Sequence, residues 1–406
     1  MKEPSAKYLA RPSTKQTDVG PIPEDWSVRR VGEMGDVRAG KALAVRAAGQ
    51  QRPYLRTKNV FDGRIDLEDV LHMPMTDSEF GRYELRHGDV LLNEGQSLEL
   101  VGRCAMYRGE LSVPCAIQNQ LVRFRAREGV SASFAAHLFR YCQKTGVFTK
   151  IALQTTSVAH LGVSRFEWLL LAWPSTLGEQ QAIADALSDA DALIESLERL
   201  LAKKRQLKQG AMQELLTGKK RLPGFKGEWK VTRLGQMLTI CHGKSQRGLE
   251  ATDGIYPILA TGGEIGRANR FLYDKPSVLI GRKGTIDEPQ YMDTPFWTVD
   301  TLFYSVVHEP NHAKFIFYRF CLIDWKQYNE ASGVPSLNAR TIEAIEISSP
   351  AADEQRAITD ILSDMDVDIA GLGAKLAKAR QIKQGMMQEL LTGRTRLLTF
   401  GAVGEC

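Results

Sequence analysis

Two short stretches of the chain contain residue types that could carry out chemistry. The first, His308-Glu-Pro-Asn-His312, has the HExxH spacing, in which two histidines on one helical face bind zinc and the glutamate acts as a general base. A proline inside a helix removes a backbone donor and clashes with the preceding turn, so Pro310 argues against one helix carrying both histidines. Proline is favoured at the first helical position, so we expect the following helix to begin there and His308 to lie in the loop before it. The pattern does not indicate a zinc site.

The second stretch, Gly243-Lys244-Ser245, resembles the last residues of a phosphate-binding loop. That motif requires a glycine where this chain has Leu238, and the matching place in the first half of the chain holds Gly40-Lys41-Ala42. Nucleotide binding is therefore not indicated. Two alternatives stay open, namely a turn that presents a lysine to a DNA phosphate and an ordinary surface turn.

The sequence offers no recognisable machinery for methyl transfer or for cleavage of DNA. It contains neither DPPY nor NPPY, the motifs for methylation of an amino group on a base, and the carboxylate-x-lysine stretch near the block boundary, Glu228-Trp-Lys230, lacks a partner acid. We therefore expect a protein that is not an enzyme by itself. Partners would supply any catalysis, and we expect this chain to bind no metal ion and no cofactor of its own.

Polar residues in two large blocks of the chain are of the types that contact nucleic acid. Arginine and lysine pair with guanine or phosphate, and asparagine and glutamine pair with adenine. The candidates are Lys41, Arg56, Lys58, Asn59, Asn93, Gln96, Ser97, Arg103, Gln118, Asn119 and Gln120 in the first block and Lys244, Arg247, Arg282, Lys283, Thr285, Ser336 and Asn338 in the second. The alternative for each is a solvated turn or a strand end.

Composition and charge are consistent with a DNA-facing protein of several domains. The 406 residues are too many for one ordinary core. The net charge of +5 is concentrated in the two blocks, as expected where a protein faces phosphate. The six cysteines are scattered singly, which fits reduced thiols, and neither a membrane-spanning run nor a signal peptide is present. We expect a cytoplasmic protein.

An internal repeat determines how the chain is organised. Residues 179–225 and 354–400 align without a gap, with well over half of the positions identical, and both contain an apolar seam with helical spacing. The seam residues expected to pack are Ile183, Leu187, Ile194, Leu197 and Leu201 in the first copy and Ile358, Leu362, Ile369, Leu372 and Leu376 in the second. Thr217-Gly218 and Thr392-Gly393 are typical helix stops.

The repeat predicts two long helices that pair. A helix of about 39 residues is about 58 Å long, and it cannot bury its seam alone. The simplest solution packs the two copies antiparallel as a rigid spacer between the blocks, with Leu197 and Leu372 in one interhelical core.

The blocks in front of the helices repeat more faintly. Trp26 with the residues after it matches Trp229 and its successors, and Phe139-Arg-Tyr-Cys142 resembles Tyr318-Arg-Phe-Cys321. We expect mixed α/β (α+β) blocks, with strands at 88–92 and 277–281 and a helix over 313–328. The expected division is an N-terminal flexible arm at 1–20, a first block at 21–178, a spacer helix at 179–218, a second block at 219–353, a second spacer helix at 354–393 and a C-terminal tail at 394–406.

This layout resembles the specificity subunits of Type I restriction-modification systems (HsdS-type). The resemblance covers nearly the whole chain and is carried by Thr17-Asp-Val-Gly-Pro-Ile-Pro-Glu-Asp-Trp26, by Pro223-Gly-Phe-Lys-Gly-Glu-Trp229, by the Glu-Gln pairs that begin the helices and by the Gln-Glu-Leu-Leu-Thr-Gly motifs that end them. Ile280-Gly-Arg-Lys-Gly-Thr285 also belongs to it. The first block departs from this last motif, with Asn93-Glu-Gly-Gln96 in place of Arg282-Lys-Gly-Thr285.

The resemblance implies two target-recognition domains, each reading one half of an asymmetric bipartite site in double-stranded DNA. It implies two methyltransferase subunits that use S-adenosylmethionine, and motor-nuclease subunits that use ATP and Mg²⁺. The twofold repeat itself favours two copies of one partner, bound at the exposed sides of 206–213 and 381–388. The alternatives are a stand-alone bipartite DNA-binding regulator or antirestriction decoy, and an enzyme whose site is not recognised.

Overall fold

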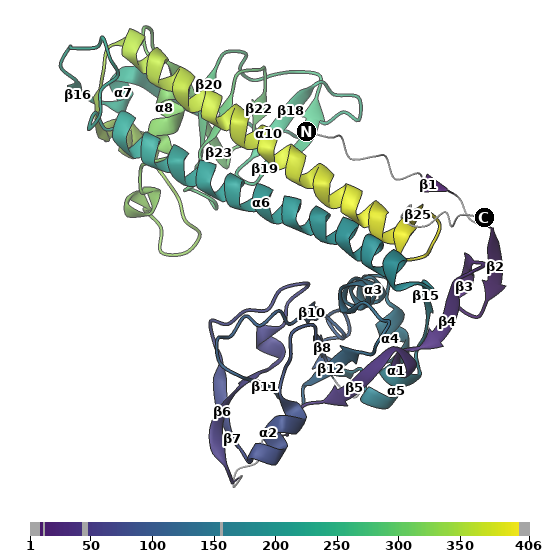
Figure 1. Ribbon diagram of the computed structural model, residues 1–406. Helices are drawn as coiled ribbons and strands as arrows, with labels where there is room; N and C mark the ends of the chain where they lie inside the picture. The colour runs from purple at the N-terminus through teal and green to yellow at the C-terminus, as the bar shows by residue number, and fades with distance from the viewer. Residues whose placement is uncertain (1–8, 11–12, 43–47, 155–156, 398–406) are drawn as a thin grey trace. The chain divides into compact units, whose positions relative to one another are not determined.

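Two long helices dominate the structure, a computed structural model that describes residues 9–10, 13–42, 48–154 and 157–397. Helix α6 is Leu177–Leu215 and helix α10 is Ala352–Leu390, each of 39 residues (Figure 1). Both begin two residues before the positions expected and end three residues before the expected limit. Gly218 and Gly393, just beyond the two ends, have φ of +74° and +71°. The predicted Thr-Gly stops are confirmed, because glycine adopts this left-handed backbone without strain.

The chain divides into two compact units. Unit 1 is Met1–Ser196 with Leu376–Cys406, and unit 2 is Leu197–Lys375, so each unit contains part of both long helices. The helices are antiparallel within each unit. Lys383 pairs with Asp191 in unit 1, and Lys204 pairs with Asp368 at 2.8 Å in unit 2.

Unit 1 is a mixed α/β body in which four strands form the main sheet, in the order β10-β8-β12-β5. These strands are β5 (Gly35–Ala39), β8 (Val90–Asn93), β10 (Cys104–Met106) and β12 (Leu121–Ala126). A second sheet has the order β11-β6-β7, from β6 (Gln50–Leu55), β7 (Leu71–Met75) and β11 (Ala116–Ile117). The small pairings use β1 (Leu9–Ala10), β2 (Thr14–Thr17), β3 (Gly20–Pro23), β4 (Ser27–Arg30), β9 (Gly95–Gln96), β13 (Leu153–Gln154), β14 (Ala159–His160), β15 (Leu170–Trp173) and β25 (Arg396–Leu397). The shorter helices are α1 (Val31–Met34), η1 (Thr57–Asn59), α2 (Asp77–Tyr83), α3 (Ala132–Lys144), α4 (Val147–Ile151) and α5 (Val163–Trp168).

Unit 2 repeats this plan. Its main sheet has the order β17-β23-β20-β21, from β17 (Leu238–His242), β20 (Ser277–Gly281), β21 (Gln290–Met292) and β23 (Leu302–Val307). Its second sheet has the order β19-β18-β22, from β18 (Tyr256–Ala260), β19 (Gly263–Ala268) and β22 (Trp297–Thr298). The remaining elements are β16 (Lys230–Arg233), β24 (Glu346–Ser349), α7 (Leu234–Met237), α8 (Ala313–Phe320), η2 (Trp325–Tyr328) and α9 (Ala339–Ala344).

Each unit buries the ends of the long helices in its own core. In unit 1, Ile183 of α6 and Leu390 of α10 belong to the same cluster as Phe134 and Trp173. In unit 2, Leu362 of α10 lies in one cluster with residues that include Leu215 of α6. Of the predicted seam, Ile183, Leu187, Leu201, Ile358, Leu362 and Leu376 are buried, and Ile194, Leu197, Ile369 and Leu372 are half-buried. Leu197 and Leu372 therefore do not form the fully buried core that the seam predicted, because two helices alone cover only part of each side chain.

Two expectations for local structure are wrong. The helix expected over 313–328 ends at Phe320, and a separate 3-10 turn follows in which the side chain of Asp324 accepts a hydrogen bond from the N–H of Lys326. The arm expected over 1–20 includes β2, which pairs antiparallel with β3. Residues 1–8 and 11–12 lie outside the described residues. Within the described part of the chain, no helix combines the length and the apolar composition that a bilayer requires.

Candidate nucleic-acid interface

In both units a glycine-lysine pair directly follows an edge strand of the main sheet: Gly40-Lys41 follows β5, and Gly243-Lys244 follows β17. The backbone N–H of Lys41 donates to the carbonyl of Ile117 (2.9 Å), and that of Lys244 donates to the carbonyl of Thr298 (2.8 Å). A Cβ atom on the glycine of either pair would lie within 2.3 Å of a backbone oxygen. Only glycine allows such a close approach, so the two pairs mark equivalent corners of the two units.

Backbone hydrogen bonds also show which loops correspond. The carbonyl of Glu94 accepts from the N–H of Leu161 (2.8 Å), and the carbonyl of Arg282 accepts from the N–H of Leu337 (3.0 Å). Glu94 therefore occupies in unit 1 the place that Arg282 occupies in unit 2. The alignment of the two blocks of sequence matched Asn93 with Arg282. The hydrogen bonds show that the equivalent residue is the next one, Glu94.

We call the loop that begins at Glu94, after β8, the corner loop of unit 1, and the loop that begins at Arg282, after β20, the corner loop of unit 2. Several side chains at the corner loop of unit 1 can accept hydrogen bonds. The Oε2 atom of Glu94 lies 2.9 Å from Nδ1 of His160, and the Glu94 side chain is 17% exposed. Gln96 pairs with the strand that carries His160, and Oε1 of Gln120 would lie 2.5 Å from a Cβ on Gly95. A carboxylate held in this way can accept a hydrogen bond from the amino group of cytosine.

The corner loop of unit 2 presents cations at the same place. Lys283 is exposed and its backbone bridges to Ser336, so the structure brings these two predicted residues together. Arg282 is half-buried, and its Nη1 donates to the carbonyl of Asp300 at 3.2 Å. Guanidinium and ammonium groups donate to guanine or to phosphate. The two units thus share a backbone framework and differ in the sign of charge that it displays.

Three predicted side chains are buried, which corrects their prediction as DNA contacts. Lys41 is only 8% exposed, and its ammonium group pairs with Glu79. Asn59 is buried, and its Nδ2 donates to the carbonyl of Asp66 at 2.9 Å. Asn93 is buried, and its Nδ2 donates to the carbonyl of Val60 at 3.3 Å. Lys41, Asn59 and Asn93 therefore each bond to another part of unit 1, to Glu79, Asp66 and Val60.

Three predicted cations of unit 1 have partners within the unit that compete with contact to DNA. Nη2 of Arg56 and Nζ of Lys58 lie 2.6 Å and 2.7 Å from the same oxygen of Asp69. The hydrogen bond from Lys58 lowers the pKa of the Asp69 carboxyl, and burial opposes this shift. The Arg103 guanidinium lies 4.8 Å from the centre of the Phe61 ring, and burial lowers its pKa. Only Lys58 of these three is exposed.

The other predicted residues are exposed or half-buried. They are Gln96, Ser97, Gln118, Asn119, Gln120, Lys244, Arg247, Thr285, Ser336 and Asn338. Asn338 has a local role as well, since its Oδ1 accepts from the N–H of Arg340 and caps α9. Glu94 and His160 were missed by the sequence reasoning. A match displaced by one residue between the two blocks would have pointed to Glu94.

The described residues contain no group of three or more histidine, cysteine or acidic side chains that could hold a metal ion. Helix α8 begins at Ala313 with His312 as its N-cap. The expected start at Pro310 is therefore wrong, and Pro310 lies in the preceding loop. His308 is within hydrogen-bond distance of the Thr239 hydroxyl at 2.8 Å, so the two histidines do not share a helical face.

A repeated cluster of tryptophan, glutamate and arginine ties each unit to the long helices. In unit 2 the guanidinium of Arg221 makes two bonds of 2.7 Å to Glu354, and the indole N–H of Trp229 donates to the same carboxylate at 3.3 Å. In unit 1 Glu179 receives equivalent bonds from Arg396 and Trp26. The glutamate at the start of one helix thus holds an arginine from just beyond the end of the other.

The glutamine after each of these glutamates fastens the block to its helix. Oε1 of Gln180 accepts from the N–H of Ser131 at 2.9 Å, and Oε1 of Gln355 accepts from the N–H of His312 at 2.9 Å. Ser131 and His312 are the N-cap residues of α3 and α8. The repeated Glu-Gln pair therefore orients the helix that supports each main sheet.

Comparison with known proteins agrees with this duplicated architecture. The family described as Type I restriction modification DNA specificity domain matches residues 23–206 and again residues 226–378. The chain therefore belongs to the family of Type I restriction-modification specificity subunits. Such subunits are in general not catalytic.

Two relatives from Methanocaldococcus jannaschii match over nearly their whole length. A protein assigned as the MjaX specificity subunit of a type I restriction enzyme is 25% identical over 97% of this chain and 99% of its own. The MjaVIII specificity subunit is 22% identical over 93% of this chain and 94% of its own.

Solved structures show the same fold. The S subunit of a Type-I restriction-modification system from M. genitalium superposes with a TM-score of 0.62 at 16% identity, covering 94% of this chain and 99% of that one. A chain from a study of complex assembly and conformational transition in the type I R-M system gives a TM-score of 0.56 at 15% identity, covering 92% and 99%.

Proposed function

We propose that this chain binds double-stranded DNA at an asymmetric two-part sequence and that the corner loops of each unit read one half. The observation that carries the proposal is the duplicated corner, which displays Glu94 with His160 in unit 1 and Arg282 with Lys283 in unit 2. A carboxylate accepts from cytosine, whereas arginine and lysine donate to guanine. Two units with different side chains on one framework would therefore read different bases.

The long helices would keep the two half-sites apart. Each contains 39 residues, which at 1.5 Å per residue is about 58 Å. Successive faces of the major groove recur about every 34 Å. A helix pair of this length is long enough to leave unread base pairs between the two halves, so the site would be gapped.

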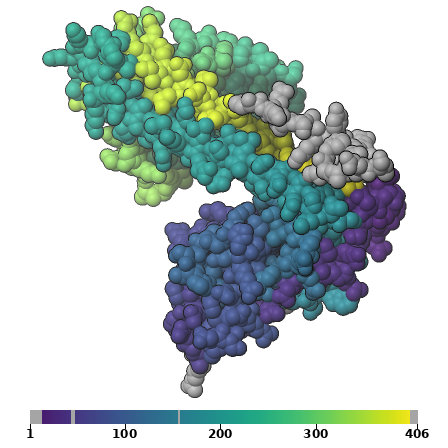
Figure 2. All heavy atoms as spheres, viewed as in Figure 1, coloured from purple at the N-terminus to yellow at the C-terminus, as the bar shows by residue number. Residues whose placement is uncertain are grey.

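The same helices would recruit two copies of a methyltransferase subunit. A protein with a twofold repeat offers one surface twice, and partners bind such surfaces in pairs. Within 206–213 and 381–388, the matched side chains that are exposed in both copies, glycines aside, are Gln206 with Gln381, Leu207 with Ile382, Gln209 with Gln384 and Gln213 with Gln388. The space-filling view shows parts of both long helices, teal and yellow, at the surface (Figure 2).

Restriction subunits with motor and nuclease activity would complete the assembly in the cytoplasm. S-adenosylmethionine, ATP and Mg²⁺ would belong to these partners and to the methyltransferase, because this chain contributes recognition. The matched surface residues on α6 and α10 support a stoichiometry of two methyltransferases to one specificity chain.

The test is a selection from random duplexes by the full chain in complex with its cognate methyltransferase. We expect one gapped two-part sequence to be enriched, with Arg282→Ala changing the preference in one half and Glu94→Gln changing it in the other. Enrichment of one continuous sequence, or of none, would contradict the proposal. A saturated complex with one methyltransferase would contradict the stoichiometry, and selection of DNA without any methyltransferase binding would indicate a stand-alone regulator or antirestriction decoy.

A further inference from the structure

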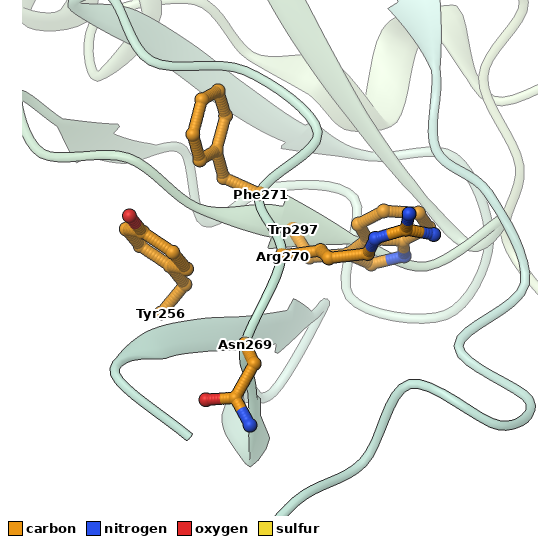
Figure 3. Close-up of a pocket in the computed structure, with 5 residues that line it drawn as sticks. All are labelled: Tyr256, Asn269, Arg270, Phe271 and Trp297. Atoms are coloured by element: carbon orange, nitrogen blue, oxygen red, sulfur yellow. The ribbon is translucent and has the colours of Figure 1, made fainter.

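Unit 2 contains an aromatic pocket that the corner loops do not use. It has a volume of about 350 Å³ and is lined by Tyr256, Asn269, Arg270, Phe271 and Trp297 (Figure 3). The rings of Tyr256 and Phe271 lie edge to face, 5.2 Å between centroids. Phe271 is 44% exposed, although an aromatic side chain of this size is usually covered in a folded protein. The lining therefore offers ring faces, one amide and one guanidinium to a ligand.

The equivalent place in unit 1 is filled. Strands β6 and β18 correspond, because each lies between an antiparallel neighbour and a short parallel strand. Their registers set Arg52 of unit 1 against Tyr256 of unit 2. The Arg52 guanidinium lies over the Phe80 ring of α2 at 4.7 Å and pairs with Asp77 of that helix at 3.0 Å.

Unit 2 has no helix between β19 and β20 that corresponds to α2, within its described residues. The chain instead passes through Asn269, Arg270 and Phe271 and leaves the pocket open. The same registers set Trp297 against Ala116 of unit 1, which is buried in the cluster that α2 completes. The pocket therefore lies where unit 1 has α2. Tyr256 and Trp297 line it at the positions that Arg52 and Ala116 occupy in unit 1.

The pocket adjoins the corner that we propose to face DNA. The indole N–H of Trp297 donates to the carbonyl of Lys244 at 2.9 Å, and the next residue, Thr298, accepts from the N–H of Lys244. Lys244 and Arg247 are exposed, and so is Arg270. Among the residues that the structure describes, no carboxylate forms an ion pair with Arg270. The pocket lining therefore includes one exposed guanidinium that can contact an anion.

A ligand that fits these groups is flat, has two apolar faces and a polar edge, and is attached to an anion. Stacking on aromatic side chains contributes to the binding of nucleobases in general, and asparagine can bond the edge of a base while arginine contacts a phosphate. We propose that this pocket binds one unstacked nucleobase of the DNA half-site that unit 2 reads. The proposal rests on the proposed function and adds a contact that unit 1 cannot make.

The test uses the full chain with its methyltransferase and the duplex enriched by selection. In the half whose preference changes with Arg282→Ala, each nucleotide is replaced in turn by an abasic one, and the dissociation constant is measured at fixed salt. We expect Phe271→Ala to weaken binding to the intact duplex about tenfold, within the range for one stacked base. At one abasic position the variant and the unaltered chain should bind equally, because the base that Phe271 contacts has been removed.

Val231→Ala is the matched control, since Val231 is 71% exposed on β16 and lies outside the pocket lining. It should not change the dissociation constant. If Phe271→Ala alters the circular dichroism spectrum, Asn269→Ala, which removes only an exposed amide, replaces it. Asn269→Ala should weaken binding to the intact duplex, and this loss should disappear at the same abasic position. A change smaller than twofold on the intact duplex, or an equal loss at every abasic position, overturns the inference.

Two further results separate this inference from the function on which it rests. If the unaltered chain enriches no two-part sequence, the proposed function fails and the pocket proposal fails with it. If a two-part sequence is enriched but the loss of affinity in Phe271→Ala disappears at no abasic position, only the pocket proposal fails. The disappearance of this loss at one position is the coupling between Phe271 and its base. Binding of free dAMP, dCMP, dGMP or dTMP that is lost in Phe271→Ala, without any coupling to the duplex, would show a site for free nucleotides and would also overturn it.

Discussion

Asp191→Asn removes one charge from a buried cluster that ties α3 to both long helices within unit 1. The Asp191 carboxylate accepts from Nη1 of Arg140 at 2.7 Å and pairs with the ammonium group of Lys383. Burial raises the pKa of Asp191, but Arg140 and Lys383 outweigh this effect and the net pKa is lowered. The carboxylate is therefore ionised when unit 1 is folded at neutral pH.

The expected cost follows from what the substitution leaves behind. The side chain of Lys383 is 7% exposed, so its ammonium group would remain buried without an anion. Arg140 would keep its second partner, Asp62, at 2.7 Å. Breaking a buried ion pair from one side costs about 3–5 kcal/mol. Because the Asp191 side chain is 35% exposed and water screens it, we expect the lower limit, about 3 kcal/mol.

Hydrogen exchange measured by mass spectrometry can locate this loss. A destabilisation of about 3 kcal/mol corresponds to exchange that is about 150-fold faster. We expect it in peptides from α3 and from the ends of the long helices that belong to unit 1, with unit 2 unchanged. Adding Lys383→Met should restore much of the protection, because an apolar side chain needs no counter-charge.

The repeat provides a matched comparison in unit 2. Asp366 accepts from the Tyr318 hydroxyl at 2.6 Å and pairs with Lys208, whose side chain is 20% exposed. Asp366→Asn should cost about 1 kcal/mol, since an amide still accepts from the hydroxyl and water reaches the lysine. Equal losses in the two units, or no rescue by Lys383→Met, would refute the argument that burial of the unpaired ammonium determines the cost.

Three further predictions follow from burial and exposure. Burial holds the pKa of His137 at about 3, below the ordinary 6.5, so the unfolded chain takes up a proton that unit 1 does not. This histidine should lower stability by up to about 1.4 kcal/mol per pH unit below pH 6.5, and His137→Ile should remove its contribution to the pH slope in urea unfolding between pH 6.5 and 5. Lys283→Ala should reduce the slope of log affinity against log salt by about one, whereas Lys41→Ala should lower the unfolding midpoint and leave that slope unchanged. The opposite pattern would reverse our assignment of exposed and buried lysines. Leu207 and Ile382 are both 53% exposed, so Leu207→Asp should leave the fold intact. Native mass spectrometry should then detect one methyltransferase per chain, and none when Ile382→Asp is added; two bound copies in the double variant would exclude this surface.

Much of the architecture could be predicted from local patterns. The helices α6 and α10 follow from apolar residues at helical spacing and from the Thr-Gly stops, and both signals lie within one segment of chain. The duplication was visible as identity at a constant offset. The half-buried state of Leu197 was not visible, because a periodic pattern tells which face is apolar and not how much of it another element covers.

The candidate interface depended more strongly on contacts between distant residues. Asparagine and lysine are suited to DNA contact wherever they are exposed, yet Asn59 and Lys41 are buried among partners that the surrounding sequence does not reveal. The match of Glu94 with Arg282 required backbone hydrogen bonds to Leu161 and Leu337, far along the chain. Residue type sets what a side chain can bind, and only packing determines whether it can reach a partner.

The sequence by itself therefore determined the repeat, the two helices and the two blocks of one plan, since these depend on short-range periodicity and on self-similarity. The tertiary structure decided which polar groups face solvent and which hold the corner loops. It also decided that α2 fills in unit 1 the space that Trp297 lines in unit 2. Burial is a property of segments brought together from distant parts of a chain, and the residues within one segment do not specify it.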